Sequence, residues 1–274
     1  MRLRKEPFSF VPMDFDPGQI AVPFRMQPGL RRIDAGAVSL APLAAATPLH
    51  AEKLAVLELG RSCHVVPGFD PAPALEAIAA RAPWWNASET ALELAFEEDF
   101  AVLDGATGTL PWLCVCVPSH WAPEDKLGLD FAALHAPVAD NAALVAASRQ
   151  LVALATGGDC WERSVWTISP SARHDQHPRR HVREPWPAAD EADAFARRCW
   201  LRAERQVFFP VGRGTRQAVF AIRVMLQPLA DAARIPGLAP RLHDSLASMS
   251  QAVLDYKNLA QAREPLLRWL RGRG

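Results

Sequence analysis

The sequence has no excess of charge of either sign and no long apolar run. Its 30 basic residues balance 30 acidic ones, so the composition gives no reason to expect a nucleic-acid or anionic-membrane partner, both of which require basic surface. The densest apolar stretch, Leu110 to Val117, is too short to cross a bilayer. The basic start MRLRKEPFSF is not followed by the apolar segment of a signal peptide. We therefore expect a cytoplasmic protein.

Cysteines are few and irregularly spaced. The set Cys63, Cys114, Cys116, Cys160 and Cys199 contains no C-x-x-C pair. This argues against a disulfide framework and against a cysteine-bound cluster or structural zinc. Cys114 and Cys116 alternate with valines, so we expect both on one face of a buried strand, as small apolar side chains.

Glycine-rich cofactor motifs are also missing. The glycines of the segment 212–214 lie in an expected turn and lack the third glycine and the following helix of a dinucleotide fingerprint. The sequence contains no phosphate-loop motif. If the protein performs redox chemistry, we expect its electrons to come from another polypeptide.

The chain divides into three regions. Residues 1–50 are rich in proline and predict an ordered arm packed on the domain, because Phe8, Phe10, Phe15 and Phe24 favour burial. Residues 51–230 form the expected central domain. The remaining residues, 231–274, predict a helical extension with apolar positions at helical spacing.

Strand and helix patterns are clustered rather than regularly alternating. Strand patterns cover 100–103, 110–117, 161–169, 200–209 and 217–226, and helix patterns begin near residues 70, 86, 140, 188, 240 and 265. The first two strands form a hairpin around Asp104-Gly105. This order predicts an α+β fold with an antiparallel sheet of about five strands flanked by helices, as in a PAS-like domain.

Three histidines at metal-ligand spacing lie in a segment rich in arginine. His174, His177 and His181 belong to SARHDQHPRRHVREP, in which Pro178 interrupts any helix. Neighbouring guanidinium groups oppose the binding of a cation. We therefore interpret the segment 170–187 as a solvated, mobile loop.

His135 has a different setting, in the sequence LHAPV. A neutral imidazole on a backbone stiffened by Pro137, beside apolar residues, suits an axial haem ligand. The same setting also suits a hydrogen-bonded core histidine. His64 and His120 remain competing ligands.

The strand 200–209 carries charge in its middle. By a period of two, one face bears Trp200, Arg202, Glu204, Gln206 and Phe208. On a neighbouring strand, Trp161, Arg163, Val165 and Thr167 also share a face. An arginine and a glutamate inside a pocket would fix a small charged substrate, because buried charges must be paired. The alternative is a solvent-facing salt bridge between strands, worth under ~1 kcal/mol.

Five segments taken together resemble a known family. They are PFRMQPGLRRID (23–34), FEEDFAVL (96–103), VPSHWAPEDKLGLDFAALHAPV (117–138), RSVW (163–166) and LRAERQVFF (201–209). In this order they are similar to the haem-dependent oxidative N-demethylase alpha-subunit-like family. The resemblance covers about residues 7–230 and leaves the last forty residues outside.

The resemblance implies a PAS-like domain that carries haem b. It implies oxidation of a small methylated amine with dioxygen, using electrons from separate flavin and iron–sulfur reductase subunits. The iron ligand would correspond to His135, and the distal-pocket arginine and glutamate to Arg163 and Glu204. Removal of electrons from an N-methyl carbon gives an iminium, which water converts to formaldehyde and the demethylated amine.

Further residues of the matched segments complete this hypothesis. Glu204, helped by Arg163 and Arg202, would orient the amine by charge-assisted hydrogen bonds. The remaining cofactor-pocket residues would be Trp121, Lys126, Trp166 and Phe208, with the aromatic rings excluding water.

Two departures from the family pattern bear on catalysis. The usual Arg-x-Asn-Trp is Arg163-Ser-Val165-Trp here, which removes an amide near the pocket. The single tyrosine, Tyr256, lies outside the resembling region, so a tyrosine-dependent step would be absent. One alternative is a non-catalytic haem- or small-ligand-binding PAS-like sensor. A second alternative is a structural or interaction protein without haem.

Overall fold

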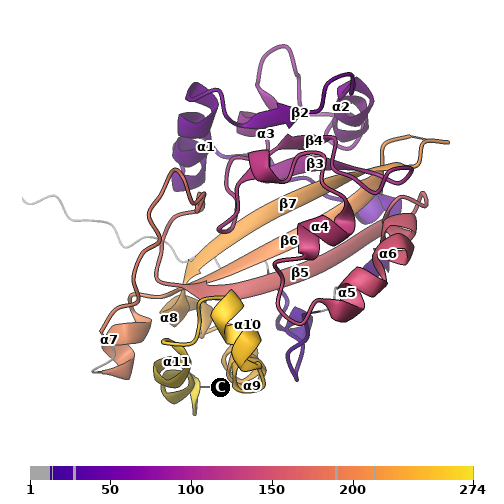
Figure 1. Ribbon diagram of the computed structural model, residues 1–274. Coiled ribbons are helices and arrows are strands. Elements are labelled where there is room, and N and C mark those ends of the chain that lie inside the picture. The colour runs from indigo at the N-terminus through magenta and orange to yellow at the C-terminus, as the bar shows by residue number, and fades with distance from the viewer. Residues whose placement is uncertain (1–12, 14, 27–28, 189–190, 213, 274) are drawn as a thin grey trace, which may run out of the picture.

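Three long strands pair side by side at the centre of the computed structural model (Figure 1). The structure describes residues 13, 15–26, 29–188, 191–212 and 214–273. Within these residues one seven-stranded antiparallel sheet forms, in the order β1-β5-β6-β7-β3-β4-β2. Its strands are β1 (Arg31–Ile33), β2 (Cys63–Val65), β3 (Glu98–Asp104), β4 (Trp112–Cys114), β5 (Cys160–Ser169), β6 (Trp200–Pro210) and β7 (Gln217–Pro228).

The sheet corrects the prediction of about five strands. The five central strands, β3 to β7, lie within the patterns read from the sequence or close to them. The two edge strands, β1 and β2, were missed, because three residues are too few to show alternation. β1 is held by pairing with β5 and by the ion pair of Arg31 with Glu162.

Helices lie at both ends of the sheet and over its faces. The α-helices of the described residues are α1 (Pro48–Glu58), α2 (Ala72–Ala79), α3 (Leu92–Ala95), α4 (Phe131–His135), α5 (Ala142–Ala146), α6 (Ser148–Ala155), α7 (Ala192–Ala196), α8 (Leu229–Ala232), α9 (Leu238–Ala247), α10 (Gln251–Tyr256) and α11 (Arg263–Leu270). Short 3-10 helices occupy η1 (Pro17–Gln19), η2 (Ala35–Ala37) and η3 (Pro123–Asp125). None of the described helices combines the length and the apolar character needed to span a bilayer.

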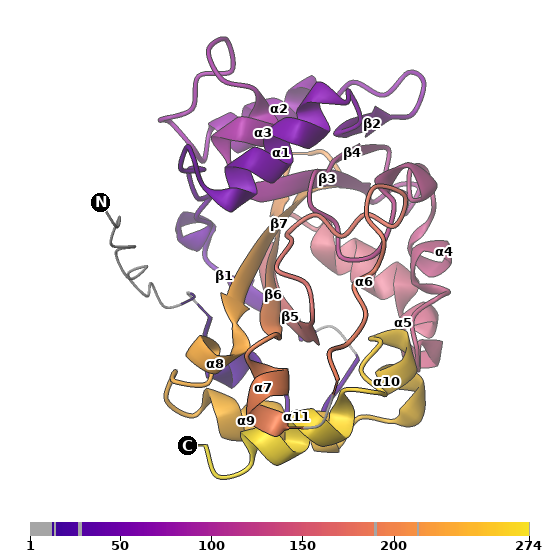
Figure 2. The ribbon, with the colours of Figure 1, turned by 90° about the vertical axis from the view of Figure 1, so that its left-hand side faces the viewer.

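The two faces of the sheet pack against different parts of the chain. Side chains in register share a face, so Arg163, Glu204 and Phe220 lie on one face, which we call the site face. The helices α4, α5 and α6 cover part of the site face (Figures 1 and 2). On the opposite face, Leu201 and Met225 pack with apolar residues of the C-terminal helices α8 to α11.

The described part of the N-terminal arm is packed against the domain. Phe15 and Ile20 are buried in the cluster formed by the C-terminal helices and the opposite face. Phe24 is half-buried and contacts the Trp166 ring edge-on, with ring centroids 6.3 Å apart. Phe8 and Phe10 lie outside the described residues.

The cysteine prediction was wrong in two respects. Cys63 and Cys114 lie directly opposite each other on β2 and β4 and form a disulfide. Their separation of 51 residues carries no disulfide motif, and only strand pairing brings them together. In addition, Cys114 and Cys116 do not share a face, because β4 ends at Cys114 and Cys116 packs with Ile222 and Val224.

A buried ion pair joins α1 to β3. Lys53 is 0% exposed and Asp99 is 2% exposed, and Nζ lies 3.0 Å from Oδ1. The Lys53 ammonium also donates to the carbonyl oxygens of Phe96 (3.0 Å) and Glu98 (2.7 Å). The second Asp99 oxygen accepts from the Val117 N–H at 2.8 Å. A buried charge requires partners, so Lys53 holds the Asp99 carboxylate in place. Through the bond to the Val117 N–H, Asp99 in turn fixes the chain just after β4.

We predict that Asp99→Asn lowers the free energy of unfolding by about 3–5 kcal/mol, because it leaves the Lys53 charge buried and unpaired. Urea unfolding measures this loss. The double variant Lys53→Met/Asp99→Asn should recover part of it, since the new amide oxygen can still accept from the Val117 N–H. Asp159→Asn, in the exposed pair with Arg32, should cost under ~1 kcal/mol. Equal losses for Asp99→Asn and Asp159→Asn would contradict the prediction.

Candidate functional site

A chain of hydrogen bonds crosses the site face. Arg163 Nε donates to Gln206 Oε1 at 2.6 Å, and Gln206 Nε2 donates to Glu204 Oε2 at 2.7 Å. The other Glu204 oxygen accepts from the Ser119 hydroxyl, which itself accepts from Arg202 Nε at 2.7 Å. We call these five residues the polar chain. Strand register explains most of it, because Gln206 lies opposite Arg163 and two residues from Glu204.

Ser119 reaches Glu204 because the segment 116–119 is tied down from several sides. Asp99 accepts from the Val117 N–H, and Arg202 Nη2 donates to the Val117 carbonyl at 3.1 Å. Arg180 Nη2 donates to the Cys116 carbonyl at 2.8 Å. These contacts place the Ser119 hydroxyl between a guanidinium and a carboxylate.

Part of the segment 170–187 is packed against the domain, which corrects the interpretation of the whole segment as a solvated loop, whereas residues 182–185 are exposed as expected. Asp175 is 2% exposed, and its carboxylate receives two bonds from Arg180, at 2.7 and 2.9 Å. Ser171, Gln176 and His177 are also buried. The physical reason is that a buried carboxylate, Asp175, pairs with Arg180, one of the arginines that the sequence suggested would stay in solvent.

The three histidines of this segment face three different carboxylates. His174 Nδ1 lies 3.6 Å from Glu52, His177 Nε2 3.1 Å from Glu124, and His181 Nε2 3.1 Å from Asp175. Among the described residues they therefore do not converge on one point. Their role is to anchor the segment to its neighbours.

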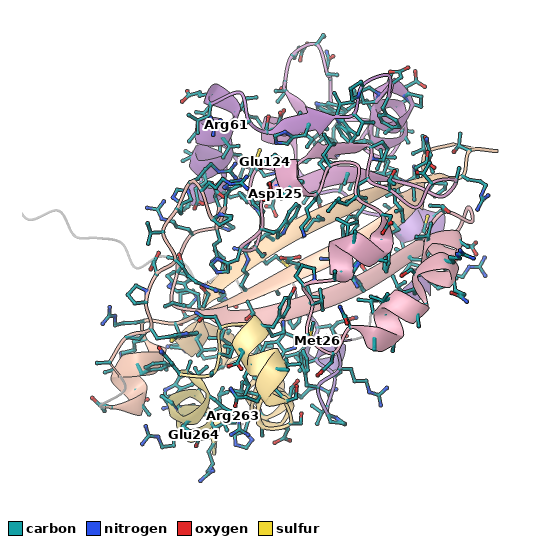
Figure 3. All side chains as sticks on the ribbon, viewed as in Figure 1. Met26, Arg61, Glu124, Asp125, Arg263 and Glu264 are labelled. Atoms are coloured by element: carbon teal, nitrogen blue, oxygen red, sulfur yellow. A yellow bond between two sulfur atoms is a disulfide. The ribbon has the colours of Figure 1, made fainter. Side chains whose placement is uncertain are left out.

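Glu124 and Asp125 extend this anchoring at η3. Figure 3 shows the two side chains next to each other above the long strands. Arg179 donates to both, at 2.6 Å to each carboxylate. The pKa of Glu124 falls to about 2, because its hydrogen bonds to His177 and Arg179 outweigh the opposing effect of burial.

Burial affects the charges of the polar chain unequally. Arg202 is 1% exposed, whereas Arg163 and Glu204 are half-buried in the middle of the sheet. Burial lowers the pKa of both arginines, and the nearby Glu204 carboxylate opposes that shift. Arg202 donates to Ser119 and to the carbonyls of Val117 and Arg173. Arg202 thus holds the polar chain in position, while Arg163 and Glu204 remain partly exposed on the site face.

His135 ends a short helix whose position is fixed by capping. Asp130 caps α4 by accepting from the Ala133 N–H at 2.8 Å, and the Phe131 N–H donates to Gly108 in the β3–β4 turn at 3.0 Å. At the other end, Asn141 Nδ2 donates to the His135 carbonyl at 3.0 Å. The His135 ring packs against the Phe131 ring, with centroids 4.1 Å apart and the two planes tilted by 30°.

Hydrogen bonding selects one form of the His135 imidazole. Nδ1 lies 2.7 Å from the Phe131 carbonyl oxygen, which can only accept, so Nδ1 carries the proton. Burial lowers the pKa of His135, assisted by the charges of Arg163 and Lys126 and opposed by the Phe131 bond. The neutral ring therefore presents an unprotonated Nε2, which has no hydrogen-bond partner within the described part of the chain. An imidazole fixed in this way is typical of a metal-ligating histidine.

Aromatic rings form an apolar wall on the same face. Phe208 and Phe220 stack with centroids 4.4 Å apart, and both are half-buried. Phe131 packs in the same cluster as Phe208, and Trp121 packs beside Phe220. Trp121 and Phe208 are thus on the face where the sequence predicted a pocket wall.

Two other predicted residues have different positions. Trp166 lies on the opposite face, buried with the C-terminal helices, and so does not wall the site. The period of two requires this, because Arg163 and Trp166 are three residues apart. Lys126 is half-buried and close enough to lower the pKa of His135. Val165 is half-buried on the site face, opposite Glu204.

Four residues of this region were not predicted as site residues. Ser119 and Gln206 belonged to segments that the resemblance had already selected, and Gln206 was on the predicted face. Tyr256 and Lys257 come from α10 and its C-cap, and no sequence pattern linked them to Glu204. The Glu204 carboxylate nevertheless acts on the pKa of both.

The fold and site define an α+β protein with a hydrogen-bonded chain of charged side chains and a neutral histidine on one sheet face. The family model described as haem-dependent oxidative N-demethylase, alpha subunit-like, matches residues 80–267. This is more than half of the chain, which belongs to that family. The matched range differs from the range of about 7–230 expected from the sequence segments. It leaves out the segment 23–34 and includes Tyr256. The position of Tyr256 therefore no longer argues against a tyrosine-dependent step.

The site face fits a haem group in three respects. His135 is neutral with Nε2 free of protein bonds among the described residues, as an axial ligand requires. The half-buried rings offer an apolar surface. Arg163 and Lys126 lie near His135 and could pair with the carboxylates of the porphyrin.

The competing histidines have less suitable surroundings. His64 Nε2 is fully buried without a partner among the described residues, on edge strand β2. His120 is exposed and has a positive φ of 60°. A separate cavity of about 890 Å³ lies between α2, the end of α6 and the β6–β7 turn, and its lining includes Arg81 and Arg216 rather than the polar chain.

We predict that Ser119→Ala lowers the free energy of unfolding by about 1–3 kcal/mol, because Arg202 Nε and a Glu204 oxygen both lose a partner. Urea unfolding measures the change. Ser88→Ala is the matched control, since Ser88 is exposed and its hydroxyl bonds, among the described residues, only to Asn86. A loss for Ser119→Ala no larger than for Ser88→Ala would show that the polar chain does not stabilise the site.

Proposed function

We propose that this protein binds haem b through His135 and carries out the dioxygen-dependent N-demethylation of a small methylated amine. The observation that carries the proposal is the neutral His135 imidazole, with its proton fixed on Nδ1, on the same sheet face as Glu204 and the aromatic wall. Membership of the family supports both the cofactor and the reaction.

The residues divide between cofactor and substrate. His135 would ligate the iron, Trp121 and Phe208 would contact the ring, and Lys126 would pair with its carboxylates. Bound haem would supply the activation of dioxygen and the oxidation of the N-methyl group. Glu204 would accept hydrogen bonds from the amine nitrogen, while Gln206 and Ser119 hold its carboxylate in place.

The reaction balances with dioxygen as oxidant. The N-methyl group loses a hydride equivalent to give an iminium, and water adds to it to release formaldehyde and the demethylated amine. Dioxygen takes these two electrons and two more from a reductase, and with four protons becomes two waters. We propose separate flavin and iron–sulfur subunits as the source of those two electrons, which agrees with the words "alpha subunit" in the family description.

The proposed architecture is a PAS-like central domain, residues 51–230, with the arm 1–50 and the extension 231–274. The hairpin β3–β4, the helical crossover and the strands β5 to β7 support the PAS-like assignment, because they supply the five central strands. We also propose a cytoplasmic location.

One observation favours the alternative of a non-catalytic haem- or ligand-binding sensor. Val165 lies directly opposite Glu204 and offers no polar group there. The family pattern has an asparagine amide at this position. Without that amide, a contact to the substrate or to oxygen would be lost, which would reduce turnover and leave haem binding intact. The two experiments that follow separate these functions.

We predict that the purified chain develops a Soret band on haem titration and that His135→Ala lowers the haem affinity at least about tenfold, the effect of losing about 1.4 kcal/mol of binding. Absorbance titration measures this. His64→Ala and His120→Ala, the rival ligands, should bind haem as the unchanged protein does. Unaltered haem binding in His135→Ala would reject the proposed ligand.

We predict that Glu204→Gln weakens amine binding about tenfold or more, because it removes a charge-assisted hydrogen bond. The measurement is the amine-induced shift of the haem spectrum, together with formaldehyde release by the haem-loaded chain in the presence of dioxygen and an added chemical reductant that supplies the two electrons of the missing reductase. The exposed Glu58→Gln is the control. Formaldehyde release by Glu204→Gln at the rate of the unchanged protein would show that the Glu204 carboxylate does not bind the amine. If the unchanged protein and every variant bind haem but release no formaldehyde, the alternative of a non-catalytic sensor is favoured.

A further inference from the structure

Two strands and a short helix bring the side chains of Cys63, Cys114 and Glu93 together. Cys63 on β2 lies directly opposite Cys114 on β4, and Glu93 belongs to α3. The two sulfur atoms and one Glu93 carboxylate oxygen all lie within 4.8 Å of one another. Figures 1 and 2 both show α3 at the end of the molecule that also holds β2 and β4. We call these three residues the thiol–carboxylate cluster.

The contacts of α3 fix the position of Glu93. Leu92 and Ala95, on either side of Glu93 in this helix, are buried in the apolar cluster that includes Phe96. The Lys53 ammonium donates to the Phe96 carbonyl at 3.0 Å, directly after the helix. Glu93 itself is 9% exposed. The packing of the helix therefore holds a buried carboxylate against the two cysteines.

The Glu93 carboxylate has few hydrogen-bond donors. Among the described residues, one oxygen accepts from the Ser62 hydroxyl at 2.6 Å and lies 3.4 Å from Cys63 Sγ. A sulfur atom in a disulfide carries no proton, so Cys63 donates nothing to this oxygen while it is bonded to Cys114. The Ser62 hydroxyl is neutral and does not compensate a buried negative charge.

The cations in this part of the fold, Lys53 and Arg180, are engaged elsewhere. Lys53 has three acceptors for its three N–H groups, the Asp99 carboxylate and two carbonyl oxygens. Arg180 donates twice to the Asp175 carboxylate, at 2.7 and 2.9 Å. Within the part of the chain that the structure describes, no lysine, arginine or histidine forms an ion pair with Glu93. A buried carboxylate in this situation favours a bound cation.

The types of donor atom identify the class of metal. Two thiolates disfavour hard cations such as Mg²⁺ and Ca²⁺, which prefer oxygen ligands, and a carboxylate is a poor ligand for Cu⁺. Zn²⁺ accepts both kinds of donor, at about 2.3 Å from sulfur and about 2.0–2.2 Å from a carboxylate oxygen. Three protein ligands leave the fourth tetrahedral position for water, and Cys63 is exposed, so an ion can enter from solvent.

We propose that Cys63, Cys114 and Glu93 bind one Zn²⁺ ion once their disulfide is reduced. A thiolate of a small dithiol attacks the exposed Cys63 sulfur and releases Cys114, and the second thiol of the dithiol then releases Cys63 and closes the reductant into a disulfide. Two electrons pass to the cysteines, and Zn²⁺ displaces their two thiol protons. An ion bonded to both sulfurs keeps them apart, so the disulfide and the zinc site are mutually exclusive forms of the same pair.

The zinc site departs from the expectation drawn from cysteine spacing. Cys63 and Cys114 are 51 residues apart and carry no metal-binding motif, and strand pairing brings them together. The disulfide links β2 to β4, and the metal would add α3 to this link through Glu93. The cluster contains no residue of the polar chain and not the proposed haem ligand His135, so the inference does not depend on the proposed function.

The test is a calorimetric titration of Zn²⁺ into the haem-free chain, after reduction with dithiothreitol and its removal without oxygen. The reduced chain should bind one Zn²⁺ tightly, and the oxidised chain should not. Cys63→Ser and Glu93→Gln should each weaken binding at least about tenfold, the effect of losing about 1.4 kcal/mol. Cys199→Ser, among the C-terminal helices, and the exposed Glu76→Gln are the matched controls and should bind Zn²⁺ as the unchanged protein does. Circular dichroism checks that each variant is folded.

Spectroscopy of the same reduced chain identifies the ligands directly. Co²⁺ in place of Zn²⁺ should give the charge-transfer absorption of cobalt–thiolate bonds, and Cys63→Ser should weaken this absorption. Equal Zn²⁺ binding by the reduced and oxidised chains, or by Cys63→Ser, would place the ion elsewhere and overturn the proposal. Unchanged binding by Glu93→Gln would show that the carboxylate is not a ligand, which also overturns it. A folded, reduced chain that binds no Zn²⁺ would show that the two cysteines serve only as a disulfide.

Discussion

Charges placed on the face of a β-sheet must be paired, and this requirement organises the site. The Glu204 carboxylate accepts from Ser119 and Gln206, and these two residues connect it to Arg202 and Arg163. Removing any inner member would leave a buried polar group without a partner. The polar chain therefore fixes the carboxylate on the strand before any ligand arrives, which is the preorganisation that substrate binding requires.

The segment between β4 and α5 joins the two halves of the site. It supplies Ser119, which completes the polar chain, and His135, whose proton is fixed by the Phe131 carbonyl. Its start is held by the Lys53–Asp99 pair and by Arg180, and its end by Asp130 and Asn141. A substrate group on Glu204 and a metal on His135 would thus be positioned by one stretch of chain that is anchored at both ends.

The sequence predicted the parts of the structure that depend on local pattern. The long strands and the shared face of Glu204 and Gln206 follow from a period of two, whereas Arg163 joins that face through the pairing register of β5 with β6. What depends on contacts between distant residues was missed: the edge strands, the Cys63–Cys114 disulfide and the hydrogen bond from Lys257 to the Trp166 carbonyl. The burial of Asp175 with Arg180 shows the same limit, because a run of arginines and histidines looks solvated until its carboxylate partners are known. Trp166 was assigned to the site through its motif, although alternation already placed it on the other face.

The most direct test of the account is to locate the iron. Crystals of the haem-loaded chain, measured at the iron absorption edge, give an anomalous difference peak at the metal position. The account predicts one peak at bonding distance from His135 Nε2, about 2 Å as for other metal–imidazole bonds, on the face that carries Glu204. A peak beside His64 or His120, or inside the cavity between α2 and the β6–β7 turn, would contradict it.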